Sequence, residues 1–319
     1  MKFIETMEII KNLPIEIALL AFRSLFFVLP RRVCLCLGQI AGHLFFSFDL
    51  RHRRIALANM EKAFGLELPP SKRSRLVRQS FLHFGQMLAD ILKWSSLSQE
   101  KREELLRVEG AENIHQALRQ GQGILLFSAH FGNWEVASEA LAKLAPLHVV
   151  ARPLDSRTAE KELLRFRSSL GARIIYKHQA AKPILQALRR NEMVAILIDQ
   201  NVLRSQAVFV DFFGLPAATT PSLASFHLRS RAPLLPVFCY PTSSLSYLVK
   251  IFPPLDFKPS GDWSADVLKI TQHSTKMVEA EIRRRPELWF WFHDRWKTRP
   301  RSEVAPSKTL TPDIQGNRA

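Results

Sequence analysis

From residue 120 onward, short apolar runs alternate with segments of helical periodicity, and this alternation constrains the fold more than any other feature of the chain. The apolar runs predict strands over residues 123–128, 147–151, 173–176, 193–198, 208–213, 234–240 and 247–252. The intervening periodicity predicts helices over residues 134–144, 158–170, 183–190, 221–231 and 266–284. Such alternation is typical of an α/β fold with a mostly parallel central sheet flanked by helices.

The first 50 residues are strongly apolar. Residues 13–29 hold only Glu16 and Arg23 as charges, and residues 33–48 hold no Asp, Glu, Lys or Arg. Neither piece is a clean span of about 20 apolar residues. Three interpretations stay open: one tilted membrane helix near residues 13–30, a pair of interfacial helices in one leaflet, or an apolar helix buried in a soluble core.

Basic residues follow this apolar run and bear on its orientation. They are Arg31, Arg32, Arg51, Arg53 and Arg54. A cleaved signal peptide fits poorly, because arginines stand where a small-x-small cleavage site would follow. The positive-inside rule then places the rest of the chain in the cytoplasm. We therefore expect a helical, apolar membrane anchor over residues 1–54.

The remainder is expected to form one domain over residues 55–300, with a disordered tail over residues 301–319. Residues 55–110 are expected to be helical, with an apolar stripe that faces the core. That stripe consists of Phe81, Phe84, Met87, Leu88 and Ile91. The tail prediction rests on its content of Pro, Ser, Thr and charged residues.

The chain carries 45 Lys and Arg against 29 Asp and Glu, a net charge of +16. This excess indicates an anionic partner, whether nucleic acid, an acidic protein or a phosphorylated membrane surface. One basic run spans residues 72–78, and another spans 283–301 and is interleaved with Trp289, Trp291 and Trp296. Trp beside Arg suits a membrane interface, although either run can also be a solvated face. Nucleic acid would explain the charge but not the apolar N-terminus.

Three cysteines, Cys34, Cys36 and Cys239, are too few and too scattered for a disulfide framework or a zinc site. This usage indicates a reducing compartment for the catalytic part. Cys239 could in principle carry an acyl group, but its position after an apolar run favours a core residue.

The segment most informative about chemistry is Ser-Ala-His-Phe-Gly-Asn-Trp-Glu at residues 128–135, between a predicted strand and a predicted helix. Ligand sites of open α/β sheets lie at the carboxyl ends of strands. There His130 sits in the loop, Gly132 allows a sharp turn and Asn133 caps the helix. Glu135, in the first helical turn, is expected to accept a hydrogen bond from His130 and fix its tautomer. The motifs of serine hydrolases, P-loop NTPases and dinucleotide-binding folds are missing from the sequence.

Two further residues are candidates. Arg167 lies in a predicted helix and by itself can simply be exposed; the family resemblance given below implies a functional position, in which it can bind phosphate or polarise the thioester carbonyl. Asp199 closes a strand at the same edge of the sheet as His130. It can orient Arg167, orient His130, or cap a turn.

These residues stand in an order that resembles the late acyltransferases of lipid A biosynthesis, the lauroyl/myristoyl transferase family of Gram-negative bacteria. The resemblance runs from the N-terminus to about residue 300. It is carried by His130-x4-Glu135, Arg167, Asp199-Gln200, and residues 208–214, 218–221, 235–238 and 295–300. Two departures lie in a loop expected to face substrate: Asp211 replaces a common proline, and Ser222 a common glycine.

The resemblance implies a glycerol-phosphate-acyltransferase-like fold and an enzyme at the cytoplasmic face of the inner membrane. The donor is an acyl thioester of acyl carrier protein. The acceptor is a hydroxyl of a hydroxyacyl chain on a phosphorylated, Kdo-bearing lipid A precursor. The resemblance implies His130 as general base with Glu135, substrate-binding roles for Asn133, Arg167 and Asp199, and no metal or organic cofactor.

Three alternatives remain at this point. The acceptor can be another glycolipid or a phospholipid. The chain can be a non-enzymatic basic protein that binds membranes or nucleic acid. Within the enzyme, Glu135 itself can handle the proton while His130 supports it.

Overall fold

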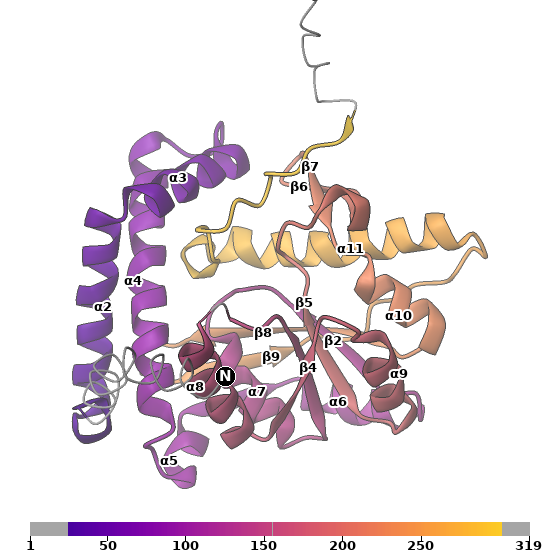
Figure 1. Ribbon diagram of the computed structural model, residues 1–319, viewed down its shortest axis with the longest axis horizontal. Helices are drawn as coiled ribbons and strands as arrows, with labels where there is room; N and C mark the ends of the chain where they lie inside the picture. The colour runs from indigo at the N-terminus through magenta and orange to yellow at the C-terminus, as the bar shows by residue number, and fades with distance from the viewer. Residues whose placement is uncertain (1–24, 155, 302–319) are drawn as a thin grey trace, which may run out of the picture.

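A seven-stranded sheet forms the centre of the computed structural model, which describes residues 25–154 and 156–301 (Figure 1). Its strand order is β1-β9-β8-β2-β5-β3-β4, and only β8 and β9 pair in an antiparallel sense. The predicted α/β fold with a mostly parallel sheet is thus confirmed. The strands are β1 (Leu106–Glu109), β2 (Ile124–Ser128), β3 (Leu147–Ala151), β4 (Ala172–Tyr176), β5 (Met193–Leu197), β8 (Leu234–Pro241) and β9 (Tyr247–Ile251).

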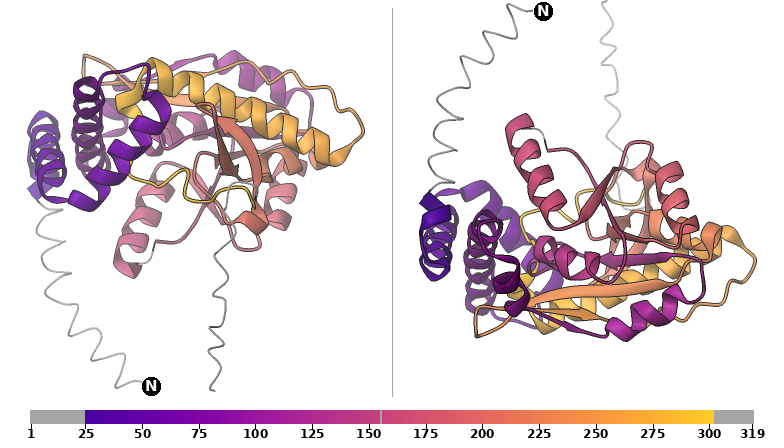
Figure 2. Two further views of the ribbon diagram at one scale, coloured as in Figure 1. Left: turned by 90° about the horizontal axis from the view of Figure 1, so that it is seen from above. Right: turned by 90° about the horizontal axis from the view of Figure 1, so that it is seen from below.

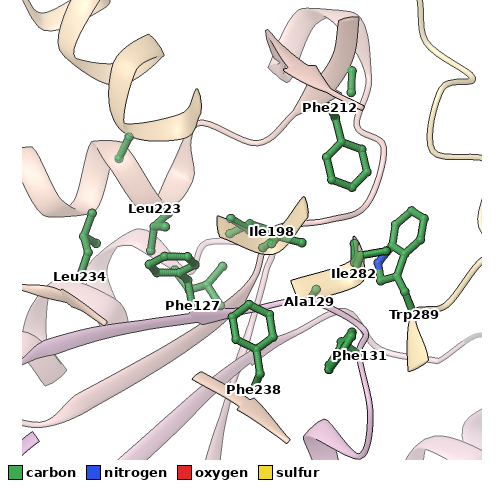
Figure 3. Close-up of a cluster of buried hydrophobic side chains, with 14 of the residues drawn as sticks. Phe127, Ala129, Phe131, Ile198, Phe212, Leu223, Leu234, Phe238, Ile282 and Trp289 are labelled. Atoms are coloured by element: carbon green, nitrogen blue, oxygen red, sulfur yellow. The ribbon is translucent and has the colours of Figure 1, made fainter. Parts of the chain in front are cut away.

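Helices cover both faces of this sheet, because successive strand residues point to opposite sides and both sides are apolar. On one face Leu126 packs in a cluster with residues of α6, α7 and α8. On the other face Phe127 packs in a cluster with residues of α9, α10 and α11, part of which Figure 3 shows. These helices are α6 (Ala111–Leu118), α7 (Trp134–Ala142), α8 (Arg157–Ser169), α9 (Ala181–Arg189), α10 (Ser222–Ser230) and α11 (Trp263–Arg284).

The strand predicted over residues 208–213 forms, but it does not join the central sheet. It is β6 (Val208–Phe212), and it pairs with β7 (Leu215–Thr219), a strand that the sequence pattern did not indicate because it consists of Leu, Pro, Ala and Thr. Phe213 and Gly214 connect the two strands with φ values of 57° and 77°. Two successive positive φ values are typical of a tight hairpin turn.

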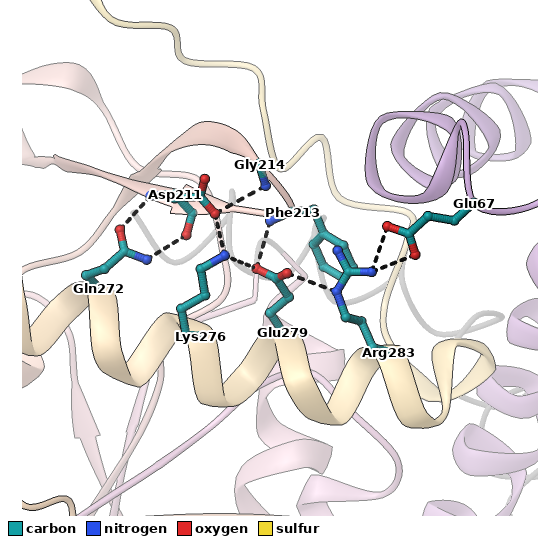
Figure 4. A network of polar contacts seen from close by, with 8 residues as sticks. All are labelled: Glu67, Asp211, Phe213, Gly214, Gln272, Lys276, Glu279 and Arg283. Atoms are coloured by element: carbon teal, nitrogen blue, oxygen red, sulfur yellow. Dashed lines mark hydrogen bonds and ion pairs between the residues drawn. The ribbon is translucent and has the colours of Figure 1, made fainter.

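Asp211 belongs to a polar network that ties this hairpin to α11, rather than to a substrate-facing loop (Figure 4). Its carboxylate pairs with Lys276, which also contacts Glu279. Arg283 extends the network by pairing with both Glu279 and Glu67, at 3.0 and 2.8 Å. Figure 4 shows Glu67 approaching from the helical layer, so the network joins three parts of the molecule.

The N-terminal helices form a separate layer beside the sheet (Figures 1 and 2). They are α2 (Arg31–Phe48), α3 (Leu50–Phe64), α4 (Pro70–Trp94) and α5 (Gln99–Glu104). Helices α2 and α4 approach each other at Gly38, Gly42 and Gly85, where a Cβ on Gly85 would lie 2.1 Å from the carbonyl oxygen of Gly38. Glycine is therefore required for this spacing of the two backbones.

Within the described parts of the chain, no single helix is long and apolar enough to span a membrane; α2 and α3 meet that length only together, with a bend of 88° between them. Most of the membrane helix predicted near residues 13–30, and all but the first residue of the predicted tail over 301–319, lie outside the described residues. The helical expectation for residues 55–110 holds for α3, α4 and α5 but misses β1, a four-residue strand next to β9.

Candidate active site

The loop from His130 to Asn133 connects β2 to α7 and is held on both sides. Gly132 has φ of +60°, and a Cβ there would lie 1.7 Å from the carbonyl oxygen of Cys239 on β8, so only glycine fits. On the other side, the Gly132 amide donates to Leu288, and the Phe290 amide donates to the His130 carbonyl, both at 2.9 Å. The loop is thus fixed between β8 and the C-terminal segment 288–290.

His130 forms a hydrogen-bonded pair with Asp199, which follows β5. Because β2 and β5 are parallel with Ser128 opposite Leu197, the residues two positions further on stand level with each other. Asp199 accepts from the His130 backbone amide at 2.9 Å, and its Oδ1 lies 2.8 Å from His130 Nδ1. Trp289 Nε1 donates to the same carboxylate at 2.8 Å. The pairing of two adjacent strands therefore creates this dyad.

Asp199 is ionised across the physiological range. Its burial opposes ionisation, but the charge and hydrogen bonds of His130 and the hydrogen bond from Trp289 outweigh that penalty and lower the pKa of Asp199 to about 2. An ionised carboxylate only accepts hydrogen bonds, so His130 Nδ1 carries the hydrogen of this contact. Nε2 of the neutral imidazole is then left with a lone pair, next to the Gln200 side-chain amide at 3.3 Å.

Glu135 is partnered by Arg167 and not by His130. Its carboxylate accepts from Arg167 Nε at 2.8 Å and from Nη2 at 2.5 Å, a bidentate ion pair between α7 and α8. Trp134 Nε1 donates to the same carboxylate at 3.1 Å. The prediction of a hydrogen bond from His130 to Glu135 is therefore wrong. Asp199 instead holds Nδ1 of His130 and fixes its tautomer, while Glu135 contacts Arg167 and Trp134.

The indole of Trp134 separates the two pairs. Its ring meets the His130 ring edge-on at a centroid distance of 5.0 Å, while its Nε1 bonds Glu135. His130, Glu135, Arg167 and Gln200 all line one cavity of about 1100 Å³. Most of its wall is apolar and comes from strand ends and helices, including Leu126, Phe127, Val149, Val150, Ile196 and Val237. The site therefore combines a base with room for long apolar ligands.

Asn133 and Cys239 have structural positions. The Asn133 side chain accepts from the Val136 amide at 3.2 Å and is fully buried, which confirms the predicted helix cap. Asn133 is not part of the cavity wall among the described residues, so the predicted substrate contact has no support in the structure. Cys239 is buried in the core as predicted, and burial raises the pKa of its thiol to about 12.

The tryptophans and Arg295 of the run near the C-terminus are buried and form no membrane interface, contrary to expectation, whereas Arg283, Arg284, Arg285, Lys297 and Arg301 of the same run are exposed. Trp289, Trp291 and Trp296 are at most 2% exposed, and Arg295 is 1% exposed. Arg295 lies 5.2 Å from the Phe212 ring and donates to the Ala218 carbonyl at 2.7 Å. Burial lowers the pKa of Arg295 to about 10. A periodic mixture of Trp and Arg is thus compatible with a core when the Arg bonds backbone carbonyls.

Sequence reasoning missed two contributors to the site. Trp289 was assigned to a membrane surface but donates to Asp199, and Trp134 was not singled out although it separates the two pairs. Trp134 adjoins Glu135 in the sequence, so its position in the motif was a usable signal. In residues 25–154 and 156–301, no group of three or more His, Cys, Asp or Glu side chains is arranged to hold a metal.

Comparisons with known proteins find relatives along most of the chain. Residues 6–298 match the family model of bacterial lipid A biosynthesis acyltransferases. A lipid A biosynthesis palmitoleoyltransferase of Escherichia coli is 27% identical over 86% of this chain and 88% of its own length. A lipid A biosynthesis myristoyltransferase of the same organism is 26% identical over 85% and 82%. A phosphatidylinositol mannoside acyltransferase of Mycolicibacterium smegmatis is 25% identical over 69% and 72%.

Proposed function

This chain belongs to the family of bacterial lipid A biosynthesis acyltransferases, and on that premise we propose that it moves a fatty acyl chain from the thioester of acyl carrier protein to a lipid hydroxyl. The hydroxyl belongs to a hydroxyacyl chain of a phosphorylated, Kdo-bearing lipid A precursor. One observation carries the proposal. The His130–Asp199 pair presents a basic nitrogen to a cavity that is large and mostly apolar.

The tautomer of His130 determines the path of the proton. Nε2 removes the proton of the acceptor hydroxyl while the hydroxyl oxygen attacks the thioester carbonyl carbon. The new C–O bond gives a tetrahedral intermediate, and its collapse breaks the C–S bond. The imidazolium returns its proton to the leaving sulfur, so the products are an ester and a free thiol. Asp199, ionised beside Nδ1, stabilises the imidazolium between these steps.

Arg167 lines the same cavity as His130 and supports the same step in this proposal. Two of its N–H groups are committed to Glu135, and the Nη1 hydrogens take no part in that pair. They supply a cation and donors for the oxyanion of the tetrahedral intermediate. The role of Glu135 is then to hold the guanidinium in place. Proton handling by Glu135 itself is disfavoured, because a carboxylate in a bidentate ion pair already shares both oxygens with a cation.

The remaining features support our proposal that the enzyme acts at the cytoplasmic face of the inner membrane. Apolar side chains of α2 are exposed, among them Val33, Ile40 and Phe45. We assign residues 1–54 to membrane attachment, residues 55–300 to the acyltransferase domain, and residues 301–319 to a disordered tail. The net charge of +16 suits an acidic carrier protein and a phosphorylated acceptor. The apolar N-terminal segment favours these partners over nucleic acid, which would explain the charge alone.

Assay of the purified full-length protein in detergent tests the proposal. The donor is acyl carrier protein loaded with labelled saturated chains, with the matching coenzyme A thioesters in parallel. The acceptor is a Kdo-bearing lipid A precursor, and mass spectrometry detects the added acyl group. We expect transfer from the carrier protein that His130→Ala removes. Absence of transfer by the wild-type protein with every donor would overturn the proposal.

A second candidate acceptor comes from one of the comparisons. The phosphatidylinositol mannoside acyltransferase of Mycolicibacterium smegmatis shares 25% identity over 69% of this chain. A glycosylated phospholipid is therefore the alternative acceptor. The same assay with this lipid replacing the lipid A precursor separates the two, because only the true acceptor gives a product whose formation saturates with acceptor.

A further inference from the structure

The central sheet opens between two neighbouring strands beside the active site. Pairing of β3 with β5 ends at Val149 opposite Ala195. Yet β5 stays paired with β2 as far as Leu197, and β3 stays paired with β4 as far as Ala151. Beyond Val149 and Ala195 the two strands therefore diverge. We call this opening the fork; the residues beside it are Val150, Ala151, Ile196 and Leu197, and all four line the cavity.

Through the fork, the cavity contacts both faces of the sheet. Side chains alternate along a strand, so Val149 packs with the cluster under α7 and α8, and Val150 packs with the cluster under α9 and α10. Both residues are part of the cavity wall. The cavity wall thus includes residues from both faces of the sheet, and we call the part of the cavity on each face a chamber.

The chamber under α7 and α8, here the α7 chamber, is deep and apolar. It extends to Leu147, the first residue of β3, and to Leu141 near the end of α7. From Leu147 to Ala151 the strand covers about 13 Å at roughly 3.3 Å per residue. The Glu135–Arg167 pair lines the same cavity on these two helices. The other wall residues of the α7 chamber include Leu126, Ala137, Leu163, Val237 and Cys239.

The chamber on the opposite face, here the α9 chamber, has an apolar floor and a polar rim. Ile184 and Phe226 belong to its floor. Lys177, Gln179 and Ser222 contribute amine, amide and hydroxyl groups to the wall. Ser222 Oγ is already hydrogen-bonded to Thr220 Oγ1 at 2.8 Å. This chamber suits a chain that carries polar groups and stays attached to a larger polar molecule.

We propose that the two chambers hold two different acyl chains during transfer: the donor chain in the α7 chamber and the hydroxyacyl chain of the acceptor in the α9 chamber. The inference rests on the proposed function, which requires both chains to reach His130 at once. The donor chain is polar only at its thioester, so a deep apolar chamber beside Arg167 fits it. The volume of about 1100 Å³ exceeds the range of roughly 300–1,000 Å³ usual for a single small ligand.

Val149 and Val150 provide a matched pair of variants, because they are neighbours of identical type that face different chambers. Val149→Phe is expected to lower kcat/KM about ten-fold for the longest donor chain that the wild-type protein accepts, which is the size of effect that one or two methylene groups have in an apolar pocket. The kcat/KM for the shortest donor chain should stay unchanged. Val150→Phe is expected to leave this donor profile unchanged and to raise the acceptor KM about ten-fold. Ala111→Leu on α6, away from the cavity, controls for an added side chain.

The measurement uses acyl carrier protein loaded with a series of saturated chains, and a lipid A precursor with full-length or shortened hydroxyacyl chains. Val149→Ala and Val150→Ala serve if a Phe variant does not fold; each should extend the length accepted in its own chamber. A donor profile that shifts equally in both variants means that one chain threads the fork, and overturns the inference. Unchanged donor and acceptor profiles in all four variants would also overturn the inference. The proposed function would still hold in that case, provided that the wild-type protein transfers the acyl chain.

Discussion

Two hydrogen-bonded pairs contribute to the same cavity, yet they differ in which atoms they leave accessible. In the His130–Asp199 pair the carboxylate is 2% exposed and the imidazole 21%, so the base reaches the cavity while its partner does not. In the Arg167–Glu135 pair both side chains are nearly buried, at 11% and 8%. In the proposed mechanism, the first pair exchanges a proton at Nε2. The second is built to keep a positive charge in one place.

The difference also shows how the fold selects partners. His130 and Glu135 are five residues apart, but Trp134 lies between them and each bonds a residue from a distant part of the chain. His130 meets its partner because two parallel strands end level, and Glu135 meets its partner because two consecutive helices cover one face. Closeness in sequence places both residues at one site without making them a dyad.

Removal of the base should have the largest effect. His130→Ala is expected to reduce kcat for transfer by a factor of about a hundred to ten thousand, because the other histidine of the cavity wall, His293, already uses its Nε2 to accept from the Asn201 amide. Turnover at saturating donor measures it, with His115→Ala, on the exposed surface of α6, as the matched control. If His130→Ala keeps more than about a tenth of wild-type turnover while Glu135 variants are inactive, the base is Glu135.

Asp199→Asn should have the second largest effect and lower kcat about a thousand-fold. An amide can donate as well as accept, so the imidazole loses the partner that fixes Nδ1–H and stabilises the imidazolium. The melting temperature distinguishes this from simple misfolding: near pH 7 the variant should melt within a few degrees of the wild-type protein and still lose rate. Asp256→Asn, at an exposed position, is the control. Wild-type turnover in Asp199→Asn would separate Asp199 from the mechanism.

Substitutions in the Arg167–Glu135 pair should lower kcat less than those in the His130–Asp199 pair, and their effects should not multiply within the pair. Arg167→Lys is expected to lower kcat about a hundred-fold, since a bidentate contact and oxyanion donors are lost, and Glu135→Gln about ten-fold. Within the pair, the double variant should be little worse than Arg167→Lys alone. Combined with Asp199→Asn, each loss should multiply, because the pairs share no hydrogen bond. Multiplicative losses within the pair would contradict its action as a unit.

The smallest effect concerns stability. The pKa of Asp199 is about 2 in the folded chain against roughly 3.9 when unfolded. Ionised Asp199 therefore contributes stability that is complete above about pH 4 and is lost as pH falls through the folded pKa. Asp199→Asn should lower the free energy of unfolding by about 2 kcal/mol at pH 7. About half of that difference should be gone by pH 3, as denaturant titrations at both pH values would show; an equal difference at both would contradict the pKa.

The alternation of apolar runs and helical segments was sufficient to predict the fold class, because fully buried parallel strands such as 193–197 consist almost only of apolar residues. It did not predict β1 or β7. β1 is too short to show a period, and β7 contains Pro216 and small residues. Nor did it place β6 and β7 outside the central sheet, since strand composition does not indicate which strand is the partner.

At the site, the sequence predicted that His130 follows a strand and that Gly132 and Asn133 begin a helix, and the structure has this arrangement. It could not choose the partner of His130, because that choice depends on the order of β2 and β5 in the sheet. The sequence pattern also could not predict that Trp289 and Arg295 are buried. Both depend on the C-terminal segment folding back over the sheet, and no local pattern encodes that return.

The contacts of segment 288–290 have a consequence for the order of events during synthesis. The amide of Phe290 holds the His130 loop, and the indole of Trp289 holds Asp199, although His130 and Asp199 are translated long before either. A growing chain that ends before residue 288 lacks both contacts, so its base is neither oriented nor enclosed. The strands and helices that line the cavity are therefore made before the contacts that hold the proposed base, and a chain truncated before residue 288 is expected to lack transfer activity.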